Sequence, residues 1–286
     1  MEPLAKIKIG TCAWSFDDWR GVFYPEGLAS TERLTQYARH FGSVEVDSTF
    51  YAAPDPRVVA HWAEITPEDF VFSCKVPREI THERRLREVA VPFAAFLESL
   101  QPLGSKLGCV LLQLPPSFQP ARDETAFRDF IRELPPQPRF AVEFRHAKWH
   151  LPRIVHLLEE HRVCWAWTDV TSLDHQHEGA FEFLPQTTDF NYVRLLGDQE
   201  RRGHSSEAPR YGELLWPRDA SLENWATRIR QRLEEHSPVF IYANNQFEGF
   251  APATAQRLSA LLGLPVTDFS PPISSAEDSA GQLTLL

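Results

Sequence analysis

The sequence predicts an α/β fold of the (β/α)₈ TIM-barrel type, and three observations support it. Eight short apolar runs recur along the 286 residues, each closing on charged or amide side chains. Segments of helix length separate them, and eight parallel strands joined by crossover helices close a barrel. The length also suits one barrel domain. The runs are residues 7–12, 44–49, 70–75, 109–114, 140–145, 163–169, 192–196 and 239–245.

Alternation within the runs predicts which side chains face the barrel interior, because successive side chains of a strand point to opposite faces. Val44 and Val46 should face the helices, so Glu45 and Asp47 should point inward. The same parity turns the following residues inward: Thr49, Ser73, Lys75, Cys109, Gln113, Ala141, Glu143, Arg145, Tyr192 and Arg194. Polar residues therefore gather at the carboxyl ends of the strands, where barrels place their chemistry.

Helix signals lie between the runs. Residues 30–33 (Ser-Thr-Glu-Arg) offer a start for a helix over residues 31–41, whose apolar residues share one face. Proline repeatedly falls in the first turn of a predicted helix, where its missing amide hydrogen does no harm. The other predicted helices are residues 56–63, 92–100, 122–134, 151–161, 222–236 and 252–262.

Two long connections and a tail complete the chain. Residues 10–29 are rich in aromatic side chains and are interpreted as a wall of the site or a packed plug. Residues 197–220 are a candidate lid. Residues 270–286 contain no aromatic residue and are expected to be disordered, so we expect one barrel domain over residues 1–269 followed by a flexible tail.

Composition limits the function classes. A formal charge of −10 repels nucleic acid and anionic membranes at long range, so anion affinity must come from local basic clusters. No run is long enough to span a bilayer and the start lacks a secretion signal, so a cytoplasmic location is expected. The four cysteines fall in four different predicted strands and are expected to be buried thiols. The basic residues Arg84, Arg85 and Arg87 are expected to lie on a solvated helix surface.

Six phrases of the sequence resemble a known family. They are residues 9–15 (Ile-Gly-Thr-Cys-Ala-Trp-Ser), 44–51 (Val-Glu-Val-Asp-Ser-Thr-Phe-Tyr), 75–82 (Lys-Val-Pro-Arg-Glu-Ile-Thr-His), 112–118 (Leu-Gln-Leu-Pro-Pro-Ser-Phe), 141–146 (Ala-Val-Glu-Phe-Arg-His) and 242–245 (Tyr-Ala-Asn-Asn). In this order they resemble the domain-of-unknown-function 72 (DUF72, YecE-like) family. The resemblance implies a (β/α)₈ barrel and supplies no activity. The chain has Asp47 where Asn is frequent in the family and Ala243 where an aromatic residue often lies.

The strand ends predict a site at the carboxyl mouth of the barrel, where opposite charges hold one another ionised and perturb pKa values. Acid, base or charge-stabilising roles are assigned to Glu45, Lys75, His82 and Glu143. Binding roles are assigned to Trp14, Asp47, Gln113, Arg145, Asp169, Arg194, His204, Tyr242, Asn244 and Asn245.

The number of cationic donors favours an anionic substrate, since arginine matches phosphate and carboxylate geometry. A phosphate is expected near the loops after the last two strands, leading into the helix near Pro252. The leading hypothesis is a hydrolase or lyase acting on a small phosphate-bearing or other anionic substrate.

Alternatives stay open at this point. Glu45 and Glu143, with Trp14 and Trp19 nearby, also fit a glycosidase-like hydrolase. A third hypothesis is a non-enzymatic anion-binding or clamp-tethered module. No nucleotide cofactor is indicated. A divalent metal is an alternative whose candidate ligands are Glu45, Asp47, Glu143, Asp169 and residues 174–178 (Asp-His-Gln-His-Glu).

The last five residues resemble the peptide with which bacterial replication and repair proteins dock into the sliding clamp. The residues that carry this resemblance are Gln282, Leu283, Leu285 and Leu286. A flexible tether ending in spaced leucines suits capture by an apolar groove. Clamp binding would connect the substrate to DNA metabolism, and nucleic-acid binding is left open.

Overall fold

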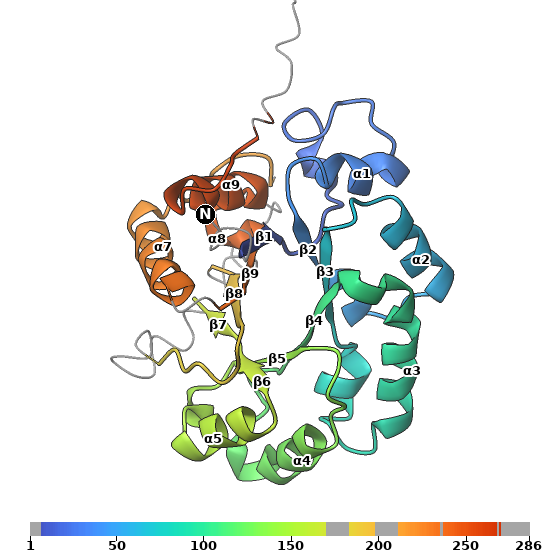
Figure 1. Cartoon of the computed structure of the whole chain (residues 1–286), viewed down its shortest axis with the longest axis vertical. Coiled ribbons are helices and arrows are strands. Elements are labelled where there is room, and N and C mark those ends of the chain that lie inside the picture. Colours follow the sequence, from blue (N-terminus) through green and yellow to red (C-terminus); the bar gives the residue numbers. More distant parts are fainter. Residues whose placement is uncertain (1–6, 170–182, 198–210, 235–236, 268, 270–286) are drawn as a thin grey trace, which may run out of the picture.

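The structure is a computed structural model that describes residues 7–169, 183–197, 211–234, 237–267 and 269, and its strands form a ring surrounded by helices (Figure 1). All paired strands are parallel. One sheet has the order β1-β9-β8-β7 and the other has the order β2-β3-β4-β5-β6. The strands are β1 (Ile7–Thr11), β2 (Ser43–Val46), β3 (Val71–Lys75), β4 (Leu107–Gln113), β5 (Phe140–Glu143), β6 (Val163–Trp165), β7 (Trp167–Thr168), β8 (Asn191–Leu195) and β9 (Val239–Ala243).

Two connections join the sheets into a barrel. At the first, Cys12 forms a parallel bridge with Glu45, and the Ala13 N–H donates to the Glu45 carbonyl at 2.8 Å. At the second, β6 and β7 belong to one run that is interrupted at Ala166, whose N–H still donates to the Val142 carbonyl of β5. The eight predicted runs therefore correspond to eight strand positions of a parallel barrel, with β6 and β7 sharing one of them, and the predicted fold class is confirmed.

The junction of β1 and β2 depends on a glycine and a tyrosine. A Cβ at Gly10 would lie 1.9 Å from the Ser43 carbonyl oxygen, so only glycine permits this approach. The Tyr37 hydroxyl accepts from the Thr11 N–H at 2.8 Å and donates to the Ser43 carbonyl at 3.0 Å. A side-chain hydroxyl thus satisfies two buried backbone groups that the strands do not pair directly.

The helices lie outside the barrel, as the sequence predicts. They are α1 (Arg33–Tyr37), α2 (Pro56–Glu64), α3 (Ala90–Leu100), α4 (Pro120–Arg132), α5 (Pro152–Glu160), α7 (Asp219–Glu234), α8 (Asn245–Glu248) and α9 (Ala251–Leu261). Helix α1 is shorter than the predicted 31–41, because the 3₁₀ turn η3 (Ser30–Glu32) precedes it and i→i+3 hydrogen bonds follow it. Among the described residues, no helix combines the length and apolar character needed to cross a bilayer.

Large apolar side chains fill the space between the strands and the helices, whereas a second, smaller cluster contains three cysteines and two alanines together with leucine, phenylalanine and tyrosine side chains. All four cysteines are buried free thiols, as expected. Within the aromatic connection after β1, Trp19, Phe23 and Tyr24 are buried in the main core. That connection therefore packs as part of the core, with Trp14 and Phe16 only partly buried against it.

Several predicted features lie outside the described residues. They are His204, residues 174–178, most of the candidate lid, and the tail with Gln282, Leu283, Leu285 and Leu286. Their assigned roles stay predictions, as does the cytoplasmic location.

Candidate functional site

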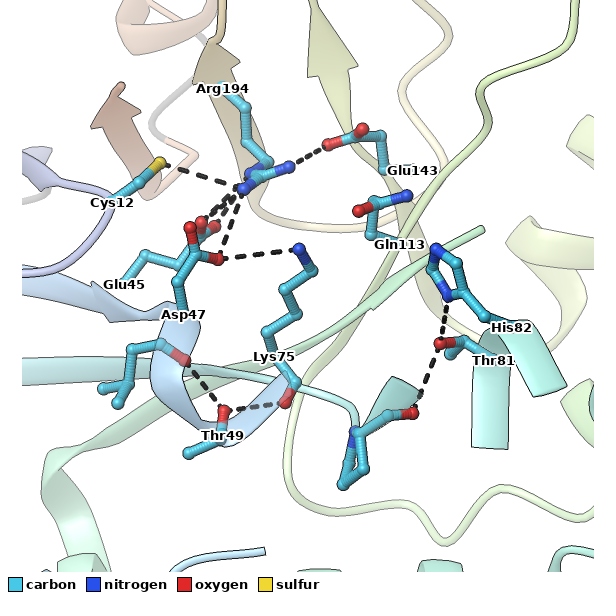
Figure 2. Close-up of polar contacts among 12 residues, drawn as sticks. Cys12, Glu45, Asp47, Thr49, Lys75, Thr81, His82, Gln113, Glu143 and Arg194 are labelled. Carbon is cyan, nitrogen blue, oxygen red and sulfur yellow. Dashed lines mark hydrogen bonds and ion pairs between the residues drawn. The ribbon is translucent and has the colours of Figure 1, made fainter. Parts of the chain in front are cut away.

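A buried arginine holds two buried glutamates together inside the carboxyl end of the barrel (Figure 2). Arg194 of β8 donates from Nε and Nη2 to the two oxygens of Glu45 on β2, at 2.9 and 2.6 Å. Its Nη1 donates to Glu143 Oε2 on β5 at 2.5 Å. The Tyr192 hydroxyl adds a 2.6 Å hydrogen bond to Glu45 Oε2. We call Glu45, Glu143 and Arg194 the buried ion network, and it ties three separated strands across the barrel.

The buried ion network keeps the carboxylate of Glu143 charged. Burial alone would raise the pKa of Glu143, but Arg145 and Arg194 outweigh it and lower that pKa to about 2. Burial would likewise lower the pKa of Arg194, yet Glu143 and Glu45 raise it well above its ordinary value. Beside them, burial and Glu45 raise the pKa of the Cys12 thiol, so that this cysteine is protonated and unsuited to act as a nucleophile.

A second set of charged groups lies nearer to solvent. Lys75, at the end of β3, places Nζ 3.7 Å from Asp47 Oδ1, and Arg194 Nη2 lies 3.7 Å from the same oxygen. These distances are too long for hydrogen bonds, and Asp47 Oδ1 has no hydrogen-bond partner among the described residues. The Asp47 side chain is 29% exposed and the Lys75 side chain 11% exposed. We call Asp47, Lys75, His82, Gln113 and Arg145 the rim.

Asp47 owes its position to a turn that strand alternation did not predict. The strand β2 ends at Val46, and Asp47 begins the 3₁₀ turn η4 (Asp47–Phe50). The buried Thr49 hydroxyl contacts the Val46 and Lys75 carbonyl oxygens at 2.8 and 2.7 Å, which fastens the turn to the end of β3 (Figure 2). The expected strand residue Thr49 is therefore a turn residue, because 3₁₀ geometry replaces the two-residue period.

The same turn places Phe50 between two rim residues. Lys75 Nζ lies 4.1 Å from the centroid of the Phe50 ring, and His82 meets that ring edge-on at 4.9 Å between centroids. Such contacts hold a cation and an imidazole in fixed positions. Sequence reasoning did not select Phe50, since an aromatic residue after a strand is more often core. Its position beside a predicted site carboxylate was the available signal.

His82 belongs to the π-helical turn η5 (Glu79–Glu83), where Thr81 Oγ1 lies 2.8 Å from its Nδ1. Burial, followed by the charges of Lys75, Arg78, Arg145 and Arg85, lowers the pKa of His82 to about 4. The imidazole is therefore neutral at pH 7. These four cations concentrate positive charge around His82, although the whole chain has a formal charge of −10.

The remaining rim residues come from β4 and the segment after β5. Gln113 is nearly buried and its Nε2 donates to the Leu114 carbonyl at 3.0 Å. Arg145 donates from Nε to Glu143 Oε1, with its side chain 11% exposed. Arg145 therefore connects the buried ion network to the rim.

The anion site expected after the last two strands is filled by the protein itself. Asp169 accepts from the N–H groups of Leu196 and Gly197, at 2.5 and 3.1 Å, and from Arg218 Nη1 at 2.8 Å. Burial is the main cause that raises the pKa of Asp169. Backbone donors that we expected to bind phosphate therefore already bind a carboxylate, so we correct that expectation.

Three other predicted binding residues are held by similar internal contacts. Asn244 caps α8 by accepting from the Gln246 N–H at 3.0 Å, and Asn245 accepts from the Ala251 N–H at the start of α9 at 2.9 Å. Tyr242 is fully buried and its hydroxyl pairs with Ser73 Oγ at 2.9 Å. Each of these side chains therefore has a structural partner within the protein.

A further expectation concerns the basic residues that follow η5. They lie in a turn and not on a helix, and the expected solvated surface is wrong for Arg85, whose side chain is 17% exposed and binds the buried carboxylate of Asp123 at 2.5 Å. Arg87 is exposed, as expected, and also reaches Asp123 at 3.2 Å, since a buried aspartate requires compensating cations. Arg84 is partly exposed and pairs with Glu79.

Trp14 is partly buried, and its ring meets the Trp62 ring of α2 edge-on at 5.5 Å between centroids.

The carboxylates do not form an open metal site in the described residues. Ligand atoms of Cys12, Glu45 and Asp47 lie within 4.8 Å of one another. The Arg194 guanidinium, however, binds both oxygens of Glu45 and lies 3.8 Å from Cys12 Sγ. A metal would have to displace this cation, so the donor set does not fit a divalent ion.

Comparison with known proteins places this arrangement in a family. The family model described as "Protein of unknown function DUF72" matches residues 8–278. UPF0759 protein YecE of Escherichia coli (strain K12) is 38% identical over 143 residues, which is 50% of this chain and 50% of YecE, so the match spans about half the length of that relative. UPF0759 protein YunF of Bacillus subtilis (strain 168) is 27% identical over 280 residues, covering 93% of this chain and 98% of YunF.

Solved structures agree. A DUF72 family protein from Thermotoga maritima MSB8 has a TM-score of 0.75 at 28% identity, covering 90% of this chain and 99% of that one. SacUVDE has a TM-score of 0.54 at 10% identity, covering 82% of this chain and 87% of that one, which shows similarity of fold alone. On the evidence of the family model, the chain belongs to the DUF72 family, a family of unknown function.

Proposed function

We propose that the protein is an enzyme of hydrolase or lyase type that acts on a small anionic substrate at the rim. The observation that carries the proposal is the arrangement of Asp47, Lys75 and Arg145, which are partly accessible above a buried ion network. A purely structural ion-pair cluster would pair all its members closely. Here Asp47 Oδ1 makes no hydrogen bond with the described residues, and its two ion-pair contacts, to Lys75 and Arg194, are both as long as 3.7 Å.

The buried ion network would act as a support. Glu45 and Glu143 are fully buried and already bound to Arg194, so neither can reach a substrate in this arrangement. We therefore assign Glu45, Glu143 and Arg194 positioning roles, in place of the acid, base and anion-clamp roles expected from the sequence. Their fixed geometry holds Arg145 and Asp47 in place, so these side chains need not reorganise when the reaction occurs.

The rim residues would then perform the chemistry. Lys75 and Arg145 would bind the anionic group, since charge-assisted hydrogen bonds to phosphate or carboxylate are strong. Asp47, whose side chain is 29% exposed, would accept a proton from a water molecule or a substrate hydroxyl. His82, neutral at pH 7, would donate or accept a hydrogen bond beside the bound anion.

The glycosidase-like alternative gains no support from the geometry. That chemistry needs two carboxyl groups on either side of a sugar, with water or substrate between them. Between Glu45 and Glu143 lies the guanidinium of Arg194, bound to both. A sugar could enter only by displacing a buried arginine.

The test is a substrate panel combined with matched variants. Phosphomonoesters, phosphodiesters and sugar phosphates are incubated with the full chain, with and without Mg²⁺, and binding is measured by titration calorimetry. Lys75→Met should weaken anion binding at least about tenfold, because a hydrogen bond to a charged group contributes about 1.5–3 kcal/mol. Asp47→Asn should retain binding and lower turnover by about 10²- to 10⁴-fold.

Asp69→Asn and Arg132→Gln serve as controls, because both side chains are more than half exposed and lie at the opposite end of the strands. Both should leave binding and turnover unchanged. Turnover that survives Asp47→Asn would remove this carboxylate from the mechanism. Binding of an anion that stays chemically unchanged after prolonged incubation would favour the non-enzymatic alternative.

A further inference from the structure

We propose that Tyr51 is a stacking platform for the ring of the substrate, so that the anionic substrate is a nucleoside phosphate. This inference rests on the proposed function, since it takes the rim cations as the phosphate site. It adds the substrate class, and it assigns a specificity role to a residue that lies outside both the buried ion network and the rim.

The exposure of Tyr51 is the first observation. Its residue surface is 81% exposed, and it is the only aromatic among the large hydrophobic residues that are exposed in the described part of the chain. Folding gains little from a ring left in water, since stabilisation by apolar groups scales with the area removed from water. A single exposed aliphatic residue is ordinary, but an exposed ring beside a candidate site provides an unused binding face.

The position of Tyr51 is the second observation. It directly follows η4, and its N–H donates to the Ser48 carbonyl at 3.1 Å. Its ring meets the Phe50 ring edge-on, with 5.5 Å between centroids. The other contacts of the Phe50 ring are the Lys75 ammonium at 4.1 Å and His82 at 4.9 Å. The exposed tyrosine and the cation of the rim therefore contact the same aromatic ring.

The positions of the rim cations and of Tyr51 favour a ligand that carries both an anionic group and a ring. A phosphate group held by Lys75 and Arg145 would leave any attached ring within reach of Tyr51, a few bonds beyond the phosphate. Base stacking on aromatic side chains tolerates any base, because every base offers a π face. A nucleoside phosphate combines this ring with the required charge, whereas a simple sugar phosphate carries the charge alone.

The chemistry does not distinguish a free nucleotide from a single-stranded oligonucleotide, so the experiment includes both sources. Dissociation constants are measured for adenosine 5′-monophosphate, ribose 5-phosphate and a short oligothymidylate. The first two ligands differ only in the base, which isolates the contribution of the ring. Tighter binding of the oligonucleotide would identify a nucleic-acid strand as the source, and tighter binding of the monophosphate would identify the free nucleotide.

Three variants complete the design. Tyr51→Ala should weaken adenosine 5′-monophosphate binding by about 5- to 100-fold, the range that loss of one stacked base gives, and should leave ribose 5-phosphate binding unchanged. Tyr51→Phe keeps the ring and should bind as the native chain does. Val91→Ala on α3 is the control, because Val91 is also 81% exposed. The two positions, Tyr51 and Val91, are both exposed, so all three variants should fold.

The outcomes separate the two proposals. Equal affinity of the native chain for adenosine 5′-monophosphate and ribose 5-phosphate would overturn the role of Tyr51 and leave the anion site standing. An equal loss for both ligands in Tyr51→Ala would do the same, since it would show a general disturbance of the rim. If none of the three ligands binds, and Lys75→Met also leaves anion binding in the substrate panel unchanged, the proposed function and this inference are overturned together.

Discussion

Replacing Arg194 by methionine is the most direct test of the buried ion network. The substitution keeps most of the side-chain volume and removes the guanidinium that binds both oxygens of Glu45 and one oxygen of Glu143. Glu143 keeps Arg145, but Glu45 is left with neutral partners, the Tyr192 hydroxyl and the Cys12 thiol. Removing one partner of a buried ion pair costs about 3–5 kcal/mol. We expect a loss of that size in the free energy of unfolding at pH 7.

The pH dependence of the loss follows from the charges. The pKa of Glu143 falls from 4.5 to about 2 on folding, which corresponds to about 3 kcal/mol of stability at neutral pH. Because the folded value lies below the unfolded one, this contribution is complete above pH 4.5 and is lost as the pH falls toward 2. In Arg194→Met, only Arg145 is left to oppose the burial of Glu143, so the pKa of Glu143 rises and this buried carboxyl group binds a proton more readily. The deficit of the variant should therefore shrink as the pH falls from 7 to 5.

Urea unfolding followed by tryptophan fluorescence, at about pH 7 and about pH 5, measures both effects. Arg132→Met is the control, because this exposed arginine pairs with the exposed Asp129 and should contribute less than about 1 kcal/mol. Adding Glu45→Gln to Arg194→Met should recover part of the loss. A variant as stable as the native chain at pH 7, or a deficit that is the same at both pH values, would refute the reasoning.

Three further predictions concern the rim and the junction of β1 and β2. Bound sulfate should raise the lowered pKa of His82 and cause proton uptake, so sulfate affinity should rise about tenfold from pH 7 to pH 5. His82→Gln should lose this pH dependence. Calorimetry in two buffers measures the affinity and the proton uptake, and a sulfate affinity that is the same at both pH values would contradict the prediction. Tyr37→Phe leaves the Thr11 N–H and the Ser43 carbonyl unpaired and should cost about 1–3 kcal/mol in urea unfolding, whereas unchanged stability would show that the hydroxyl is dispensable. Gly10→Ala would place a Cβ 1.9 Å from the Ser43 oxygen and should prevent native folding, so a native circular dichroism spectrum and melting temperature would disprove this steric argument.

Much of the site was predictable because it follows from strand parity. The inward direction of Glu45, Glu143 and Arg194 depends only on the two-residue period within regular strands, and the structure brings all three together. The period fails where a strand ends early. Asp47 and Thr49 lie in a 3₁₀ turn, and His82 lies in a π-helical turn, so their positions depend on local geometry that alternation does not encode.

The division between buried and accessible charges could not be predicted from residue types. The sequence predicts carboxylates and cations at the strand ends, but it does not predict which of them form ion pairs. Asp169 illustrates this, because only the folded chain brings it to the N–H groups of Leu196 and Gly197 and thereby fills the expected phosphate site. Asp123 is similar, since its contacts with Arg85 and Arg87 join residues more than thirty positions apart.

The sequence by itself determined the barrel, its eight strands, the family resemblance and the collection of charges at the carboxyl ends. These properties follow from hydrophobic periodicity and from the direction of successive side chains, which are local. The tertiary structure decided which charges neutralise one another, which carboxylate oxygen makes no hydrogen bond, and that Tyr51, with its ring in water, contacts the same Phe50 ring as the Lys75 ammonium. Those outcomes depend on distances of a few ångströms between distant segments, and electrostatic and hydrogen-bond energies change steeply over such distances.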